Sequence, residues 1–208
     1  MKILDINNWK RKEHFNFFSQ FDEPFFGIVS ETDCTIAYKT VKEKDYSFFA
    51  YYLHKSLIAV NQIEEFKYRI DGDRIIIYDE IHASPTIGRE DGTFAFSFIE
   101  FNSDFLTFEE SLKMEIANVK DSIGLRLTDN AGRKDSIHYS SIPWSSFTGL
   151  THARNFKFVD SVPKITFGKI FARDGKKIMP VSINVHHGLI DGLHVGKYLA
   201  LFQKLMDQ

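Results

Sequence analysis

Apolar side chains recur at steps of three or four residues over residues 47–66, and this spacing predicts a helix that packs on a core. Its apolar stripe consists of Phe49, Leu53, Leu57, Val60 and Ile63. Ser47 is placed to cap its first turn. Helices are also predicted over residues 9–20, with Asn8 as the cap, over residues 108–123 and over residues 192–206.

Strands account for most of the remaining predicted structure. Two short hairpins are expected, with turns at Asp71-Gly72-Asp73 and at Asp174-Gly175. The predicted strands cover residues 25–36, 66–70, 74–78, 93–101, 138–144, 164–172 and 177–187.

The order of these elements predicts the fold class. Helices and strands are interspersed without a strict strand-helix-strand rhythm, so we expect an α/β protein of the α+β type, in which helices pack on a mixed, largely antiparallel sheet. No stretch rich in proline, glycine or serine divides the chain, and no repeat is evident. Residues 1–208 are therefore expected to form a single domain.

Composition and charge narrow the class of protein. The chain has 208 residues and a formal net charge of -2, which gives no reason to expect a nucleic acid or an anionic membrane as partner. Its one cysteine, Cys34, forms no internal disulfide. The N-terminus has no apolar signal segment, and no stretch approaches the roughly 18 apolar residues of a membrane span. We expect a cytoplasmic protein.

Aromatic residues make up 15% of the chain, and 21 of its residues are Phe. A Phe-rich core explains this content, and so does a pocket that accepts a flat or apolar ligand. Composition leaves both explanations open.

Candidate chemistry lies at the end of the strand predicted over residues 177–187. Strand alternation places Val181, Ile183, Val185 and His187 on one face. An imidazole among apolar side chains is disfavoured in its charged form, and a neutral imidazole accepts a proton from a hydroxyl. The alternative is a core histidine without a catalytic role.

Three motifs resemble those of a known family. Residues 186–192, His-His-Gly-Leu-Ile-Asp-Gly, are similar to the His-His-x-x-x-Asp-Gly signature of chloramphenicol acetyltransferases and dihydrolipoyl acyltransferases. Residues 8–15, Asn-Trp-Lys-Arg-Lys-Glu-His-Phe, and residues 140–144, Ser-Ser-Ile-Pro-Trp, resemble blocks of chloramphenicol acetyltransferases. The order of the motifs agrees as well, so the resemblance covers essentially the whole chain.

This resemblance implies the fold of coenzyme A-dependent acyltransferases and a direct reaction between two substrates. His187 would remove the proton of an acceptor hydroxyl, so that its oxygen attacks the thioester of acetyl-CoA. Ser140 would donate a hydrogen bond to the resulting oxyanion. Thr166 would help to hold the intermediate through a water molecule.

The resemblance also assigns supporting roles. Asp191 would form an ion pair with Arg11 that braces the loop of the active site, and the carbonyl of His187 itself would fix the tautomer of its ring. Phe17, Phe18 and Thr86 would line the acceptor pocket. Residues 85–88 and 124–136 depart from the familiar acceptor wall, which leaves the acceptor open.

Acetyl-CoA is therefore the expected co-substrate, no metal is expected, and a homotrimer is implied by the family. The implied function is acetylation of a hydroxyl of chloramphenicol. Two alternatives stay open, namely transfer to another small hydroxylated acceptor, and a relative without activity that binds a small molecule. A dihydrolipoyl acyltransferase is disfavoured because no lipoyl domain or Ala/Pro-rich linker precedes the motifs.

Overall fold

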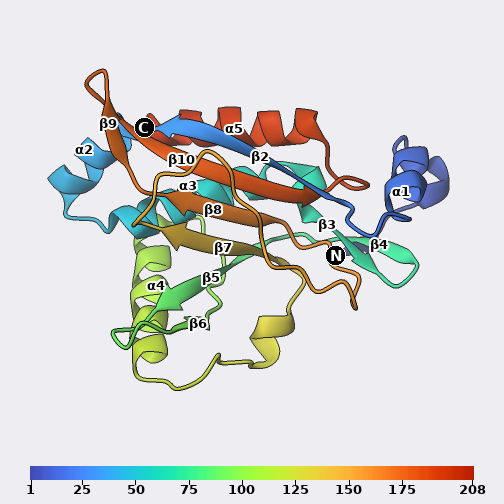
Figure 1. The fold of residues 1–208 in the computed structure, drawn as a ribbon, viewed down its shortest axis with the longest axis horizontal. Coiled ribbons are helices and arrows are strands. Elements are labelled where there is room, and N and C mark those ends of the chain that lie inside the picture. The colour runs from blue at the N-terminus through green and yellow to red at the C-terminus, as the bar shows by residue number, and fades with distance from the viewer.

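The computed structural model describes residues 1–208, and a mixed sheet of seven strands lies at its centre (Figure 1). Strand β10 is antiparallel to β2, β8 and β9, whereas β7 is parallel to both β8 and β5, and β6 is antiparallel to β5. In spatial order the path consists of β2 (Phe25–Asp33), β10 (Lys176–His186), β8 (Lys164–Gly168), β7 (Ser136–Ile142), β5 (His82–Gly88) and β6 (Phe94–Phe96), with β9 (Phe171–Arg173) beside β10. The predicted mixed sheet is confirmed.

A second, three-stranded sheet contains the predicted hairpin. It consists of β1 (Lys2–Ile3), β4 (Arg74–Ile77) and β3 (Tyr68–Asp71), all antiparallel. Gly72 in the hairpin turn has a φ of 62°, a left-handed conformation that glycine adopts without strain. Strand β3 begins at Tyr68 and not at the predicted residue 66, because residues 64–67 form a short 3-10 helix, η2 (Glu64–Lys67).

Two helices cover the apolar face of the large sheet. They are α3 (Phe48–Asn61) and α5 (Gly192–Met206). Helix α5 has the predicted range, whereas α3 ends five residues before the predicted end at residue 66. The hydroxyl of Ser56 on α3 lies 2.9 Å from the hydroxyl of Tyr139 on β7 and 2.7 Å from that of Tyr198 on α5. These hydrogen bonds join sheet and helices inside a core of 36 buried side chains.

The other helices are α1 (Lys12–Phe18), α2 (Thr35–Lys44) and α4 (Phe105–Lys120), with short 3-10 helices η1 (Ile6–Asn8) and η3 (Asp129–Gly132). Helix α4 begins three residues before the predicted start because Asp104 caps it, accepting a hydrogen bond from the Thr107 amide. No helix has the length and apolar character that crossing a membrane requires.

Several predicted boundaries are wrong. Asn8 caps no α-helix. It is the last residue of η1, and its side chain donates a hydrogen bond to the carboxylate of Asp5, whereas α1 begins only at Lys12. The strand predicted over residues 25–36 ends at Asp33, whose carboxylate accepts hydrogen bonds from the amide and hydroxyl of Thr35 and so starts α2. Helix α2 and strand β5 were not predicted.

Two further predicted strands are shorter than expected. The strand over residues 164–172 is divided after Gly168 into β8 and β9, and only Phe94–Phe96 of residues 93–101 form a strand. The turn at Asp174-Gly175 is confirmed, and both of its residues have positive φ, 51° and 76°.

Candidate active site

His187 follows directly after β10, and two phenyl rings enclose its imidazole. The ring of Phe18, from α1, stacks on it with 4.0 Å between centroids and 14° between planes. The ring of Phe26, from β2, lies 4.5 Å away at 45°. The amide of His187 donates to the carbonyl of Pro24 at 2.8 Å, which attaches the end of β10 to the start of β2. The side chain is half-buried.

The expected hydrogen bond from the ring to its own carbonyl is absent. Nδ1 of His187 is buried and has no hydrogen-bond partner, and the carbonyl of His187 instead accepts from Nη2 of Arg11 at 3.2 Å. Stacking on Phe18 and the tilted contact with Phe26 therefore orient the imidazole, and Nε2 is the ring nitrogen left for an incoming molecule.

The expected ion pair between Arg11 and Asp191 is present. Asp191 is also the N-cap of α5, since its carboxylate accepts from the Leu193 amide at 3.0 Å, and the Asp191 amide donates to Nδ1 of His194 at 3.0 Å. Burial alone would raise the pKa of Asp191, but the positive charge of His194 and Arg11 outweighs it and holds the pKa below its usual value. Arg11 thus joins α1 to the segment that carries His187.

Ser140 and Thr166 lie side by side on the other face of the sheet. Thr166 on β8 is in register with Ser140 on β7 and with Ser182 on β10. Residues in register point to the same face, so these three hydroxyls form a row, while Tyr139 and Ile165 point into the core. Thr166 is fully buried, and its hydroxyl lies 3.4 Å from Nε2 of His152.

One copy of the chain does not bring this row of hydroxyls to His187. Ser182 is in register with Thr166, and His187 lies five residues after Ser182 along the extended strand β10 and the residue that follows it. At about 3.3 Å per residue the separation is about 16 Å. His187 and Ser140 of the same copy are therefore too far apart to contact the same reacting atoms.

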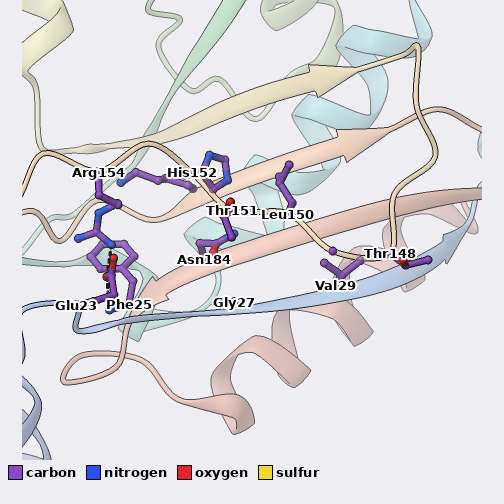
Figure 2. A pocket seen from close by; sticks show the side chains of 12 residues that line it. Glu23, Phe25, Gly27, Val29, Thr148, Leu150, Thr151, His152, Arg154 and Asn184 are labelled. Atoms are coloured by element: carbon purple, nitrogen blue, oxygen red, sulfur yellow. Dashed lines mark hydrogen bonds and ion pairs between the residues drawn. The ribbon is translucent and has the colours of Figure 1, made fainter.

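Beside this row lies a pocket of about 500 Å³ on the polar face of the sheet (Figure 2). Lys164 and Asn184, in register on β8 and β10, contribute to its floor, and the segment that carries His152 and Arg154 covers it. The lining residues are Glu23, Phe25, Gly27, Val29, Thr148, Gly149, Leu150, Thr151, His152, Arg154, Lys164 and Asn184.

The guanidinium of Arg154 is one of two largely buried cations of the pocket wall, and its side chain is 11% exposed. Figure 2 shows it above the ring of Phe25, and its Cζ lies 3.5 Å from the ring centroid. Its Nη1 donates to Glu23 at 2.8 Å, whereas Nε is buried without a hydrogen-bond partner. Lys164 is buried too, with Nζ 2.6 Å from Asp160. Burial lowers the pKa of Lys164.

Sequence reasoning did not find His152, Arg154 or Lys164. The first two lie in a segment without regular secondary structure, so no periodicity reveals where they point. Lys164 carries a signal, because it lies two residues before Thr166 and strand alternation puts both on one face.

The remaining predicted site residues lie in two places. Thr86 follows Pro85, which is in register with Tyr139, so Thr86 extends the row of Ser140 and is half-buried. Phe17 is next to Phe18, with 5.1 Å between ring centroids, and is 59% exposed. No cluster of three or more His, Cys, Asp or Glu side chains could hold a metal ion.

The chain is similar to known proteins along nearly its whole length. Residues 1–203 match the family model described as chloramphenicol acetyltransferase. A chloramphenicol acetyltransferase of Proteus mirabilis is 28% identical over 99% of this chain and 94% of the relative, and one of Staphylococcus aureus is 27% identical over 98% of each.

Solved structures agree with these matches. A chloramphenicol acetyltransferase superposes with a TM-score of 0.92 and 34% identity over 99% of both chains. A dihydrolipoamide acetyltransferase of Azotobacter vinelandii superposes with a TM-score of 0.67 at 16% identity, over 95% of this chain and 86% of the other, which shows a likeness of fold alone.

Proposed function

The chain belongs to the chloramphenicol acetyltransferase family, and on that premise we propose that it transfers an acetyl group from acetyl-CoA to a hydroxyl of chloramphenicol. The observation that carries this proposal is the stacked, half-buried imidazole of His187, with one ring nitrogen enclosed and the other left for the acceptor. Residues 1–208 act in it as one acyltransferase domain, which the single large core supports.

His187 is the base and Ser140 the oxyanion donor in this mechanism. Nε2 of His187 takes the proton of the acceptor hydroxyl while the hydroxyl oxygen bonds to the thioester carbon. The hydroxyl of Ser140 donates to the resulting oxyanion, and Thr166 holds the same intermediate through water. The carbon–sulfur bond then breaks, and the sulfur of CoA takes the proton from His187. An acetyl ester and free CoA leave, and no acyl-enzyme forms.

The reacting groups come from two copies of the chain, because about 16 Å separates His187 from the row of Ser140 and Thr166 within one copy. A closed homotrimer supplies three such interfaces, with His187 of one copy facing Ser140 of the next. Exposed aromatic side chains support an interface, since Phe156 is 66% and Phe158 is 72% exposed. We place the reaction in the cytoplasm, where acetyl-CoA is available.

Release of free thiol from acetyl-CoA with chloramphenicol as acceptor tests this function. We expect turnover in the wild type and a loss of about 10³-fold in His187→Ala, within the range for removal of a general base. His14→Ala is the control, because His14 is exposed on α1. Turnover only with other alcohols would point to a different acceptor, and no turnover with any acceptor would favour a binding protein.

Mixing two inactive variants tests the shared site. A homotrimer of His187→Ala alone, or of Ser140→Ala alone, has no intact site. If equal amounts of the two are coexpressed, about a quarter of the interfaces pair a native His187 with a native Ser140. We expect a corresponding recovery of turnover in the mixed trimer. Absence of any recovery in a mixed trimer of confirmed composition would contradict a site shared between copies.

A further inference from the structure

We infer that the pocket beside Thr166 recognises acceptors that carry a carboxylate in addition to the hydroxyl that is acetylated. The inference rests on the proposed function, because it assumes that the hydroxyl reacts next to Ser140 and Thr166. It adds a second class of acceptor, hydroxylated carboxylic acids. The evidence is the position, charge and unused hydrogen-bond donors of Arg154 and Lys164.

Lys164 lies within reach of a molecule bound at Thr166. Both residues are on β8 and point to the same face, two residues or about 7 Å apart. His152 touches the pocket and contacts the Thr166 hydroxyl at 3.4 Å, so the pocket is continuous with the row of hydroxyls. An acceptor whose hydroxyl reacts at Thr166 therefore extends towards Lys164 and Arg154.

The pocket wall carries two cations, and each has a carboxylate partner. Its lining contains two cations, Arg154 and Lys164, and one carboxylate, Glu23, which already binds Arg154. Asp160 lines the neighbouring cavity, but its carboxylate lies 2.6 Å from Nζ of Lys164 and 3.8 Å from Nε of Arg154, so it offsets the second positive charge. His152 adds no positive charge near neutral pH, since burial and the nearby charges of Lys164 and Arg154 lower its pKa. The formal charges of the two cations and their two carboxylates cancel, so the case for a bound carboxylate rests on the hydrogen-bond donors that the two cations leave unused.

Both cations also have N–H groups without an acceptor. An ammonium has three donors, and Nζ of Lys164 uses two of them, on Asp160 and on the carbonyl of Val162. Arg154 donates only through Nη1, because the nearest carboxylate oxygen of Asp160 lies 3.8 Å from its buried Nε, too far for a hydrogen bond. The side chains of Lys164 and Arg154 are only 9% and 11% exposed, so water does little to replace the missing bonds. A carboxylate supplies the acceptor oxygens that both groups lack.

Two matched benzyl alcohols test the inference by release of thiol from acetyl-CoA. 4-(Hydroxymethyl)benzoate carries a carboxylate across the ring from its hydroxyl, and 4-methylbenzyl alcohol has a methyl group there. We expect the wild type to show a kcat/KM about 10-fold or more higher for the carboxylate, as hydrogen bonds to a charged group predict. This preference should fall as salt is added, because the attraction is between charges.

Substitutions then locate the preference. In Lys164→Gln and in Arg154→Gln the ratio of kcat/KM between the two alcohols should fall several-fold. Arg173→Gln is the matched control, because Arg173 also pairs with a glutamate, Glu31, but lies on β9 outside the pocket. It should keep the ratio of the wild type. If a pocket variant does not fold, the salt dependence of the wild-type preference tests the inference instead, and a preference that is absent or independent of salt contradicts it.

The outcomes separate this inference from the proposed function. Turnover of chloramphenicol with equal use of the two alcohols, with use of neither, or with a ratio that both pocket variants retain would overturn the carboxylate class alone. Absence of thiol release with chloramphenicol as well, or release that His187→Ala leaves intact, would overturn the proposed function itself.

Discussion

The imidazole of His187 lies flat against the ring of Phe18, 4.0 Å away. Phe26 contacts it from a second direction, and Nδ1 has no hydrogen bond. Two phenyl rings, from α1 and β2, therefore take the orienting role that a hydrogen bond to Nδ1 plays for many catalytic histidines. The direction in which Nε2 of His187 points therefore depends on the packing of its ring against Phe18 and Phe26.

Replacement of Phe18 tests this dependence. Phe18→Leu keeps an apolar side chain but removes the flat surface, so the imidazole gains freedom to rotate. We expect kcat/KM to fall by about 10-fold or more, since small misplacements of a reacting group are costly. Phe18 is half-buried on a short helix, so the melting temperature should change little.

Phe21→Leu is the control for Phe18→Leu. Phe21 contacts Phe18, with 5.3 Å between the ring centroids, but it makes no ring contact with His187. Its kcat/KM should stay close to that of the wild type. Equal losses in the two variants would contradict an orienting role that is specific to Phe18.

The ion pair of Arg11 and Asp191 gives a second prediction, on stability. Asp191→Asn keeps an oxygen that caps α5 but leaves Arg11, whose side chain is 14% exposed, without its counter-charge. We expect the free energy of unfolding to fall by about 2 kcal/mol, measured by urea denaturation. Arg11→Gln combined with Asp191→Asn should cost less than the sum of the two single changes. If the losses in the free energy of unfolding of the two single variants simply add, the interaction between Arg11 and Asp191 contributes nothing to stability.

Arg69 gives a third prediction. Its side chain is fully buried and has no carboxylate partner, and its guanidinium donates to four backbone carbonyls, those of Phe66, Tyr68, Lys134 and Ser136. It therefore joins β3 to the start of β7.

Arg69→Met would leave these carbonyls without donors. We expect a loss of about 3 kcal/mol in the free energy of unfolding, because several buried acceptors become unsatisfied together. Arg74→Met, on the exposed end of the same hairpin, should change it by about 0.5 kcal/mol or less. Similar unfolding curves for the two variants would exclude the bracing role of Arg69.

Elements with a strong local signal could be predicted from the sequence. Helix α5 occupies the predicted range because Asp191 caps it and its apolar stripe is regular. Helix α2 was missed because only Ala37 and Val41 of its ten residues are buried, which leaves almost no apolar stripe. Strand β5 contains Pro85 and ends at Gly88, residues that favour loops, and its pairing with β6 and β7 overrides that preference.

Some features of the site could likewise be predicted from the sequence, and others depend on tertiary structure. The ion pair of Arg11 and Asp191 was expected from the motifs and is present. The pairing of Ser140 with Thr166 depends on the register of two strands that a long segment separates, and no single-sequence pattern specifies it. Arg154 was missed because its position depends on how the segment between β7 and β8 folds back over the sheet.

A fourth prediction concerns the pH dependence of stability. His186 is 2% exposed, and its Nδ1 accepts from the amide of Gly188 at 3.1 Å. Burial, with a smaller contribution from the charge of Arg154, lowers the pKa of His186 to about 4. An unfolded histidine has a pKa of about 6.5. Between these two values the unfolded chain binds a proton that the native state does not, so stability falls as the pH falls.

The slope of this effect is measurable by urea denaturation at several pH values between 7 and 5. A single such group contributes up to about 1.4 kcal/mol per pH unit in this range, on top of the contributions of other groups. His186→Asn keeps an acceptor for the Gly188 amide but does not titrate, so the slope should become shallower. His14→Asn, on the exposed side of α1, should keep the slope of the wild type. If His186→Asn and the wild type lose stability in parallel, His186 is not held neutral by its burial in the folded protein.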